Sequence, residues 1–180
     1  LCRQVLLHGA QVGLAHDGDG DRVLAVDEDG KLIDGDQIMA ICGLALLEEG
    51  RLPQRAIAAT VYSNLGLIEA FRQAGGAVEV TGNGDRQVLE VMLRKGLVLG
   101  GEQSGHIIFL QYNTTGDGLL TAVQLLATMV RSGQPLTRLA GRMRRFPQAL
   151  ENVRVTRKNG WQENPLVKEA ISECRIRLGE

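Results

Sequence analysis

The chain has 180 residues and a formal net charge of −1, from 20 basic and 21 acidic side chains. This balance gives no excess positive charge to attract nucleic acid or an anionic membrane surface, so we expect neither partner. Apolar residues make up 44% of the chain, which is enough for a buried core, and no apolar run has the length of a membrane span. The three cysteines form no metal-binding or redox spacing, which is typical of a cytoplasmic protein.

Two short apolar stretches predict strands at residues 12–15 and 23–26. Between them, Asp17, Asp19 and Asp21 alternate with glycines. The outer two carboxylates would lie roughly 13 Å apart in an extended strand, but oxygen ligands of Mg²⁺ lie about 2.1 Å from the ion. The glycines let the backbone curl, and a divalent cation would relieve the repulsion between the three charges. We therefore interpret this loop as a Mg²⁺ site.

Two other interpretations of this loop are weaker. An acidic surface turn needs no ion, since Asp and Gly are common turn residues. An EF-hand loop could run from Asp17 to Glu28, but its sixth position must be Gly, and here it is Arg22. The apolar flanks also predict strands rather than helices, which argues against an EF-hand.

From residue 35 the pattern alternates between helix and strand. Helices are predicted at residues 37–49, 65–74, 86–95 and 118–131 and after Pro135, and strands at residues 56–61, 77–80, 97–99 and 107–110. Helix caps are expected from Asp34 or Asp36, from Ser63 or Asn64, and from Asp117. This alternation predicts an α/β fold, a three-layer α/β/α domain with a mixed sheet.

The dipeptide Phe146-Pro147 predicts a boundary, because proline biases the residue before it out of a helix. Beyond it we expect a strand at residues 153–156, a helix at about 165–174 and the start of another strand at 175–178.

A second group of polar residues follows the strand predicted at residues 97–99. Glu102 can accept hydrogen bonds from two neighbouring sugar hydroxyls, and Ser104 can donate or accept one. His106 has the pKa range to move protons or to hold a phosphate. Taken alone, these residues are equally well explained as solvated or strand-end side chains.

A third group, Gly84-Asp85-Arg86, lies at a predicted helix N-terminus. Free N–H groups and the helix dipole favour phosphate at such a position. We interpret Asp85 as a cap and Arg86 as the better candidate for substrate binding.

In this order along the chain, the loop from Asp17 to Arg22 and the loop from Gly101 to His106 resemble the metal-binding and sugar-binding loops of the alpha-D-phosphohexomutases. Gln103 and the Gly84-Asp85-Arg86 group resemble the members that act on glucosamine phosphate. Residues that depart from the usual pattern are His16, Asn83 and Gln87.

The resemblance implies three parts: the C-terminal end of the family's second α/β domain with the metal loop (1–34), its third domain with the sugar-binding loop (35–147), and the start of its small α+β fourth domain (148–180). It implies Mg²⁺ as the cofactor. The residues to which it assigns roles are Asp17, Asp19 and Asp21 as metal ligands, Arg22 and His106 in catalysis, and Arg86, Glu102, Ser104 and His106 in substrate binding.

It also implies interconversion of glucosamine 6-phosphate and glucosamine 1-phosphate through a 1,6-bisphosphate and an enzyme phosphoserine. The implied partner is then a small-molecule sugar phosphate. A homodimer of the longer protein is one possibility. Nothing in the chain resembles the family's phosphoserine loop, and the chain begins at Leu1 without a signal-peptide pattern, so we expect a fragment that is inactive by itself. The alternatives are a mutase of mannose or glucose phosphates and an inactive truncation that only binds metal or sugar phosphate.

Overall fold

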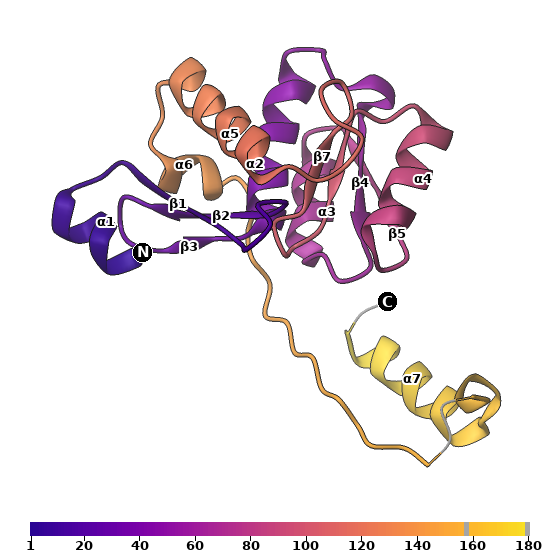
Figure 1. Ribbon diagram of the computed structural model, residues 1–180. Coiled ribbons are helices and arrows are strands. Elements are labelled where there is room, and N and C mark those ends of the chain that lie inside the picture. The colour runs from indigo at the N-terminus through magenta and orange to yellow at the C-terminus, as the bar shows by residue number, and fades with distance from the viewer. Residues whose placement is uncertain (157–158, 179–180) are drawn as a thin grey trace. The chain divides into compact units, whose positions relative to one another are not determined.

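The computed structural model describes residues 1–156 and 159–178. The contacts within the chain divide it into two compact units, residues 1–147 and residues 148–180 (Figure 1). Each unit is described separately below.

The first unit begins with a helix and a small antiparallel sheet. Helix α1 (Cys2–His8) precedes the strands β1 (Val12–His16), β2 (Val23–Asp27) and β3 (Leu32–Ile33). The strands pair in the order β1-β2-β3, and His16 lies opposite Val23 at the end of the β1–β2 hairpin. The two strands predicted around the acidic loop are confirmed. The sequence analysis missed α1, a helix of only two turns that ends at Gly9 in the left-handed conformation.

A second, four-stranded sheet forms the body of this unit. Its elements are α2 (Gly35–Glu48), a short 3₁₀ helix η1 (Pro53–Arg55), β4 (Ala56–Thr60), α3 (Leu65–Gln73), β5 (Ala77–Thr81), α4 (Asp85–Lys95), β6 (Leu99–Gly101), β7 (Ile107–Phe109), α5 (Gly118–Ser132) and α6 (Leu136–Ala140). The strand order is β5-β4-β6-β7. Strand β4 is parallel to β5 and β6, whereas β6 and β7 are antiparallel, so the sheet is mixed as predicted.

Side chains alternate between the two faces of this sheet. In β4, Ile57 and Ala59 pack with the residues of α2, α3 and α5, whereas Ala56 and Ala58 pack with α4. This two-residue period is that of a strand buried on both faces. Helices cover both sides of the sheet in Figure 1. The predicted α/β/α layering is therefore confirmed.

The helix starts set the positions of the loops at one edge of this sheet. Asp34 caps α2 and forms a capping box with Gln37, Asn64 caps α3, and Asp117 caps α5. Because β4, β5 and β6 are parallel, the segments that follow them emerge at the same edge.

The second unit contains a short 3₁₀ helix, η2 (Trp161–Glu163), and the helix α7 (Pro165–Leu178). The predicted strands at 153–156 and 175–178 are wrong. Residues 151–155 have no regular structure, and α7 continues through residues 175–178. A strand is stable only when paired in a sheet, and the described residues of this unit include no strand with which either segment could pair.

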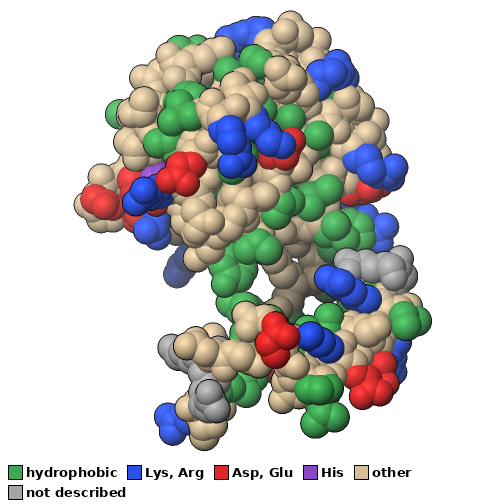
Figure 2. Space-filling model, turned by 90° about the vertical axis from the view of Figure 1, so that its right-hand side faces the viewer, with side chains coloured by type: hydrophobic (Ala, Val, Ile, Leu, Met, Phe, Trp, Pro, Cys, Tyr) green, Lys and Arg blue, Asp and Glu red, His purple; other side chains and the backbone are tan. Residues whose placement is uncertain are grey.

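The surface of the described residues carries charges of both signs. In Figure 2, Lys and Arg side chains lie close to Asp and Glu side chains, with hydrophobic side chains exposed between them. Within the described part of the chain, no helix combines the length and apolar character needed to cross a membrane.

The two-unit division predicts where a protease cuts first. Arg154 lies in an exposed segment without regular structure, whereas the arginines at positions 22–142 are held in a packed unit. Such exposed segments are the preferred sites of proteolytic nicking. Brief trypsin treatment followed by mass spectrometry should therefore show early cleavage after Arg154, and an earlier cut inside residues 22–142 would contradict the division.

Candidate active site

The acidic loop closes the β1–β2 hairpin. His16 and Val23 pair at the ends of the two strands, which forces residues 17–22 to turn back within six residues. The carboxylates of Asp17, Asp19 and Asp21 each offer one oxygen, and these three oxygens lie within 4.8 Å of one another. The structure therefore brings the three predicted metal ligands together.

The chemistry of this loop fits a hard divalent cation. Oxygens about 2.1 Å from an octahedral ion lie about 3 Å apart when adjacent and about 4.2 Å apart when opposite, so only a small closure of the loop is needed. Oδ1 of Asp21 is buried and, among the described residues, accepts no hydrogen bond. A buried carboxylate oxygen that accepts no hydrogen bond is costly, and an ion would satisfy it.

Arg22 lies against two of the three carboxylates. Its Nε is 3.4 Å from Oδ2 of Asp17 and 3.5 Å from Oδ1 of Asp21. Partial burial works to raise the pKa of Asp17, but the Arg22 backbone N–H, the Asp21 carboxyl and the Arg22 charge together hold this pKa below its ordinary value. Arg22 thus moderates the repulsion within the acidic loop.

Residues 102–106 form the tip of a second hairpin, between β6 and β7. The Glu102 N–H donates to the His106 carbonyl across this tip, at 2.9 Å. The Val23 N–H donates to the Gly105 carbonyl at 3.2 Å and so joins this hairpin to the β1–β2 hairpin. Gly105 has a φ of +95°, and a Cβ there would lie 2.2 Å from the Val23 carbonyl oxygen, so this contact requires glycine.

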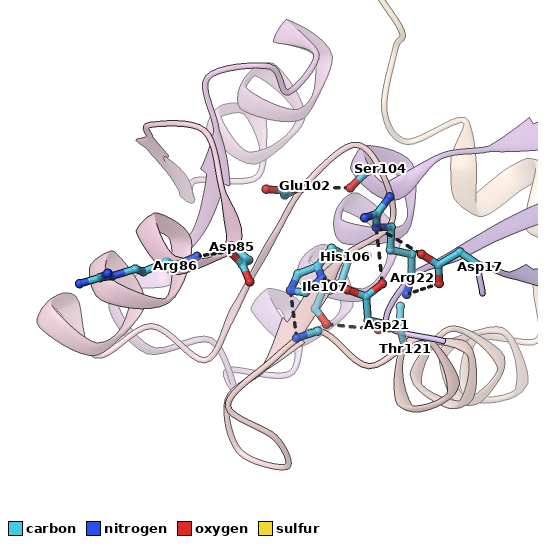
Figure 3. Close-up of polar contacts among 11 residues, drawn as sticks. Asp17, Asp21, Arg22, Asp85, Arg86, Glu102, Ser104, His106, Ile107 and Thr121 are labelled. Atoms are coloured by element: carbon cyan, nitrogen blue, oxygen red, sulfur yellow. Dashed lines mark hydrogen bonds and ion pairs between the residues drawn. The ribbon is translucent and has the colours of Figure 1, made fainter. Parts of the chain in front are cut away.

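The His106 ring lies between the two loops, with 5% of the residue exposed. Its Nδ1 is 3.1 Å from Oδ2 of Asp21, and its Nε2 accepts a hydrogen bond from the Gly116 N–H at 3.1 Å (Figure 3). Because Nε2 accepts, the proton belongs on Nδ1, where it is donated to the carboxylate. His106 therefore holds Asp21 in place, with both ring nitrogens engaged, and its catalytic role stays a prediction.

Glu102 and Ser104 lie on the same side of their loop. Ser104 Oγ donates to Oε2 of Glu102 at 3.0 Å (Figure 3). Glu102 lines a cavity of about 340 Å³, and the two hairpins meet there. The residues that line it are Asp21, Arg22, Asn83, Gly84, Asp85, Glu102 and His106. A larger hollow of about 460 Å³ between β1 and α5 is mainly apolar and carries no such group of charges.

Arg86 lies elsewhere. Its side chain extends along α4 and pairs with Glu90, its Nε 2.9 Å from Oε1, with 87% of the Arg86 side chain exposed. Arg86 is not among the residues that line the cavity, whereas Asn83, Gly84 and Asp85 are. Asp85 does not cap α4, since Gly84 is the N-cap and makes no side-chain cap bond. The rule that parallel strands end at one edge would have singled out residues 83–85, because they follow β5 directly.

A buried carboxylate lies behind the loop of residues 102–106. Asp36 is 0% exposed, and its Oδ2 accepts hydrogen bonds from the Asn64 N–H at 2.7 Å and from Nε2 of Gln103 at 3.1 Å. Burial raises the pKa of Asp36 above its ordinary value of 3.8. The Asn64 N–H, Ser63 and Gln103 oppose this shift, and the nearby charge of Asp34 adds to it.

Comparison with known proteins places this site in a family. Residues 34–146, more than half of the chain, match the family described as phosphoglucomutase/phosphomannomutase, alpha/beta/alpha domain III. The chain belongs to this phosphohexomutase family. The predicted membership of the chain in the phosphohexomutase family is thereby confirmed.

Among curated relatives, phosphohexomutases of the phosphoglucosamine mutase type are similar over nearly the whole chain. The Symbiobacterium thermophilum phosphoglucosamine mutase is 56% identical over 97% of this chain and 39% of its own length. The Pelotomaculum thermopropionicum phosphoglucosamine mutase is 57% identical over 95% of this chain and 38% of its own length. The chain thus spans about two fifths of the length of these relatives.

Solved phosphohexomutases share the fold. A phosphoglucomutase/phosphomannomutase family protein from Burkholderia thailandensis has a TM-score of 0.71 and 29% identity, over 83% of this chain and 31% of its own. The Aspergillus fumigatus N-acetylphosphoglucosamine mutase, in complex with GlcNAc-6P and magnesium, has a TM-score of 0.64 and 18% identity, over 81% of this chain and 38% of its own.

The raised pKa of Asp36 predicts how a substitution changes the pH dependence of stability. The folded chain holds a proton on Asp36 more readily than the unfolded chain, so the contribution of Asp36 is full below pH 3.8 and is lost as the pH rises through the raised pKa. The neutral variant Asp36→Asn lacks this loss. As the pH rises from 3.8 through the raised pKa, the free energy of unfolding of Asp36→Asn minus that of the unchanged chain should therefore increase.

Urea unfolding at a series of pH values measures this difference. A difference between the two proteins that stays constant with pH would contradict the assignment.

Proposed function

We propose that this chain is the part of a phosphoglucosamine mutase that holds Mg²⁺ and the sugar. The observation that carries the proposal is the 340 Å³ cavity that residues of the acidic loop and Glu102 line together. The similarity to phosphoglucosamine mutases supports this choice, as does the magnesium in the fungal relative of the same fold. The activity proposed for the longer protein is interconversion of glucosamine 6-phosphate and glucosamine 1-phosphate.

The proposed organisation follows the sequence analysis. Residues 1–34 would be the end of a second domain, residues 35–147 a third domain, and residues 148–180 the start of a fourth. The phosphoserine that donates the phosphoryl group would come from another part of the longer protein. A cytoplasmic location and a homodimer also belong to the proposal.

Phosphoryl transfer depends mainly on positioning and on neutralising charge. Asp17, Asp19 and Asp21 would hold Mg²⁺, which supplies positive charge beside the transferring phosphate. The Nε of Arg22 lies near Asp17 and Asp21, and its two Nη groups would donate to phosphate oxygens. His106 would keep Asp21 in place through Nδ1–H.

Glu102 and Ser104 would bind neighbouring sugar hydroxyls. Their mutual hydrogen bond of 3.0 Å places the two side chains close enough to contact neighbouring hydroxyls of one sugar. They would bind the sugar with either of its ends toward the phosphate donor. Asp85 lines the same cavity, and its carboxylate would suit the ammonium group of glucosamine. We propose no contact to the substrate for Arg86, because its side chain leaves the cavity.

Two alternative functions can each be tested. A mutase of mannose or glucose phosphates would use the same acidic loop, and turnover of each sugar phosphate separates these from the glucosamine activity. An inactive truncation that only binds metal or sugar phosphate would show binding without turnover in any context.

The chain by itself should show no mutase activity. It carries an acceptor site and metal ligands, but no segment resembling the phosphoryl donor of the family. A coupled assay for glucosamine 1-phosphate with the purified 180-residue chain should stay at background. Formation of product that Asp19→Ala abolishes would contradict this expectation.

In a longer protein, the two loops should respond differently to substitution. A suitable protein is one in which this chain replaces the matching segment of the Symbiobacterium thermophilum relative. Asp19→Asn removes one charge from the metal ligands, and such a loss typically lowers kcat about a hundredfold. Glu102→Gln weakens hydrogen bonds in both ground and transition states, so its effect should appear mainly in KM.

The measurement is kcat and KM across a Mg²⁺ titration. Excess Mg²⁺ should partly rescue Asp19→Asn and leave Glu102→Gln unchanged, because only the former alters metal affinity. Asp29→Asn is the control, since Asp29 is exposed in the β2–β3 turn and pairs only with Lys31 among the described residues. Rescue of Glu102→Gln by Mg²⁺ would show that the two loops are wrongly assigned.

A further inference from the structure

The buried carboxylate of Asp36 does not line the cavity, yet it contacts the loop that does. Its Oδ2 has two donors, the backbone N–H of Asn64 and the amide of Gln103, whereas its Oδ1 accepts no hydrogen bond from the described residues. Burying a carboxylate is unfavourable, and an apolar residue would be cheaper for the core alone. The contacts of Asp36 therefore need an explanation beyond packing.

On one side, Asp36 and its neighbour hold the sugar-binding loop from behind. The Gly35 N–H donates to the Gln103 carbonyl at 2.9 Å. A Cβ on Gly35 would lie 2.1 Å from the Glu102 carbonyl oxygen, so the first turn of α2 touches the loop backbone directly. Gln103 turns its side chain toward Asp36, while Glu102 and Ser104 on either side of it bond to each other.

On the other side, Asp36 contacts the turn that holds the end of the first unit. Asn64 is 2% exposed, and its side chain pairs with both backbone groups of Phe146. Its Oδ1 accepts from the Phe146 N–H at 3.0 Å, and its Nδ2 donates to the Phe146 carbonyl at 2.8 Å. Phe146 is the residue before Pro147, where the unit ends.

We infer that Asp36 is a positioning residue that couples the sugar-binding loop to the end of the first unit, through the path Gln103–Asp36–Asn64–Phe146. The functional meaning of this coupling rests on the proposed role of Glu102 and Ser104 in binding the sugar. Coupling is reciprocal, so a change that frees the loop also loosens the Phe146 segment, and a ligand that orders the loop also orders that segment.

Amide hydrogen exchange on the full chain tests this coupling without any need for activity. Gln103→Met removes the amide donor while keeping the length of the side chain. We expect about tenfold faster exchange at Gly105, since a hydrogen bond to a charged group is lost. We also expect faster exchange at Phe146, whose N–H bonds to Asn64 and not to Gln103.

Gln73→Met is the matched control, because it removes an amide-to-carboxylate bond of 2.7 Å between Gln73 and Glu69 on the exposed face of α3. It should leave Phe146 unchanged. Asp36→Asn keeps an oxygen for both donors and should exchange nearly as the unchanged chain does, whereas Asp36→Leu should loosen both segments. The backbone amide of Ile57 in β4 reports global unfolding, and its protection from hydrogen exchange should stay the same in every variant compared.

The result that overturns the inference is loss of protection confined to residues 102–106, with Phe146 unaffected by Gln103→Met. If Asp36→Leu does not fold, Gln103→Met and Asp36→Asn decide the question. In the longer protein, Gln103→Met should raise KM at least about fivefold with little change in kcat. Coupled exchange in a longer protein that turns over no sugar phosphate would support the coupling and overturn the proposed function instead.

Discussion

Two hairpin tips from different sheets meet at the cavity, and the site depends on their contact. The Val23 N–H donates to the Gly105 carbonyl, and the backbones of Arg22 and His106 form an isolated antiparallel β-bridge. The acidic loop belongs to the three-stranded sheet, whereas Glu102 belongs to a loop of the four-stranded sheet. Their distance is therefore set by backbone contacts that leave no room for a side chain at Gly105. A site built on such contacts is more rigid than one built on separate loops.

Negative charge dominates this cavity. Asp21, Asp85 and Glu102 line it, with Arg22 as the only cation among the described lining residues. Such a field repels a phosphate, so a phosphorylated substrate needs added positive charge at the acidic loop. The same field favours a ligand with a cationic group elsewhere, as in an amino sugar. The charge balance is thus consistent with both a divalent cation and glucosamine phosphate.

Much of the fold could be predicted because its signals are local. Alternating apolar runs, glycine stops and caps such as Asp34 and Asp117 depend on neighbouring residues, and they predicted the α/β/α order. The strands expected near residues 153 and 175 were wrong because a strand depends on a partner that local pattern does not supply. The two-turn helix α1 was missed since most of its apolar residues, including Leu6 and Leu7, are exposed.

The sequence predicted which residues form the candidate site better than it predicted how their side chains are oriented. Spacing and resemblance brought together the three aspartates and Glu102, but they could not show where His106 and Arg86 point. A histidine in a loop can extend to a ligand or bond to its neighbours, and the choice depends on Asp21 and Gly116, which are distant in sequence. Arg86 has Glu90 one helical turn away, and this pairing takes its side chain from the cavity.

The amide of Gln103 bonds to a carboxylate behind its loop, and Gln103 is not among the residues that line the cavity. Its position within the motif indicated the glucosamine type, which suggests a direct contact, but its amide bonds to Asp36 behind the loop. A residue without an amide donor at this position would leave Asp36 with one donor fewer and change the support of Glu102. If Glu102 binds sugar hydroxyls as proposed, the chemical identity at position 103 would act through the placement of the Glu102 carboxylate. In the proposed site, the packed turn of α2 beneath the loop would therefore affect sugar binding as well as the side chains proposed to contact the sugar.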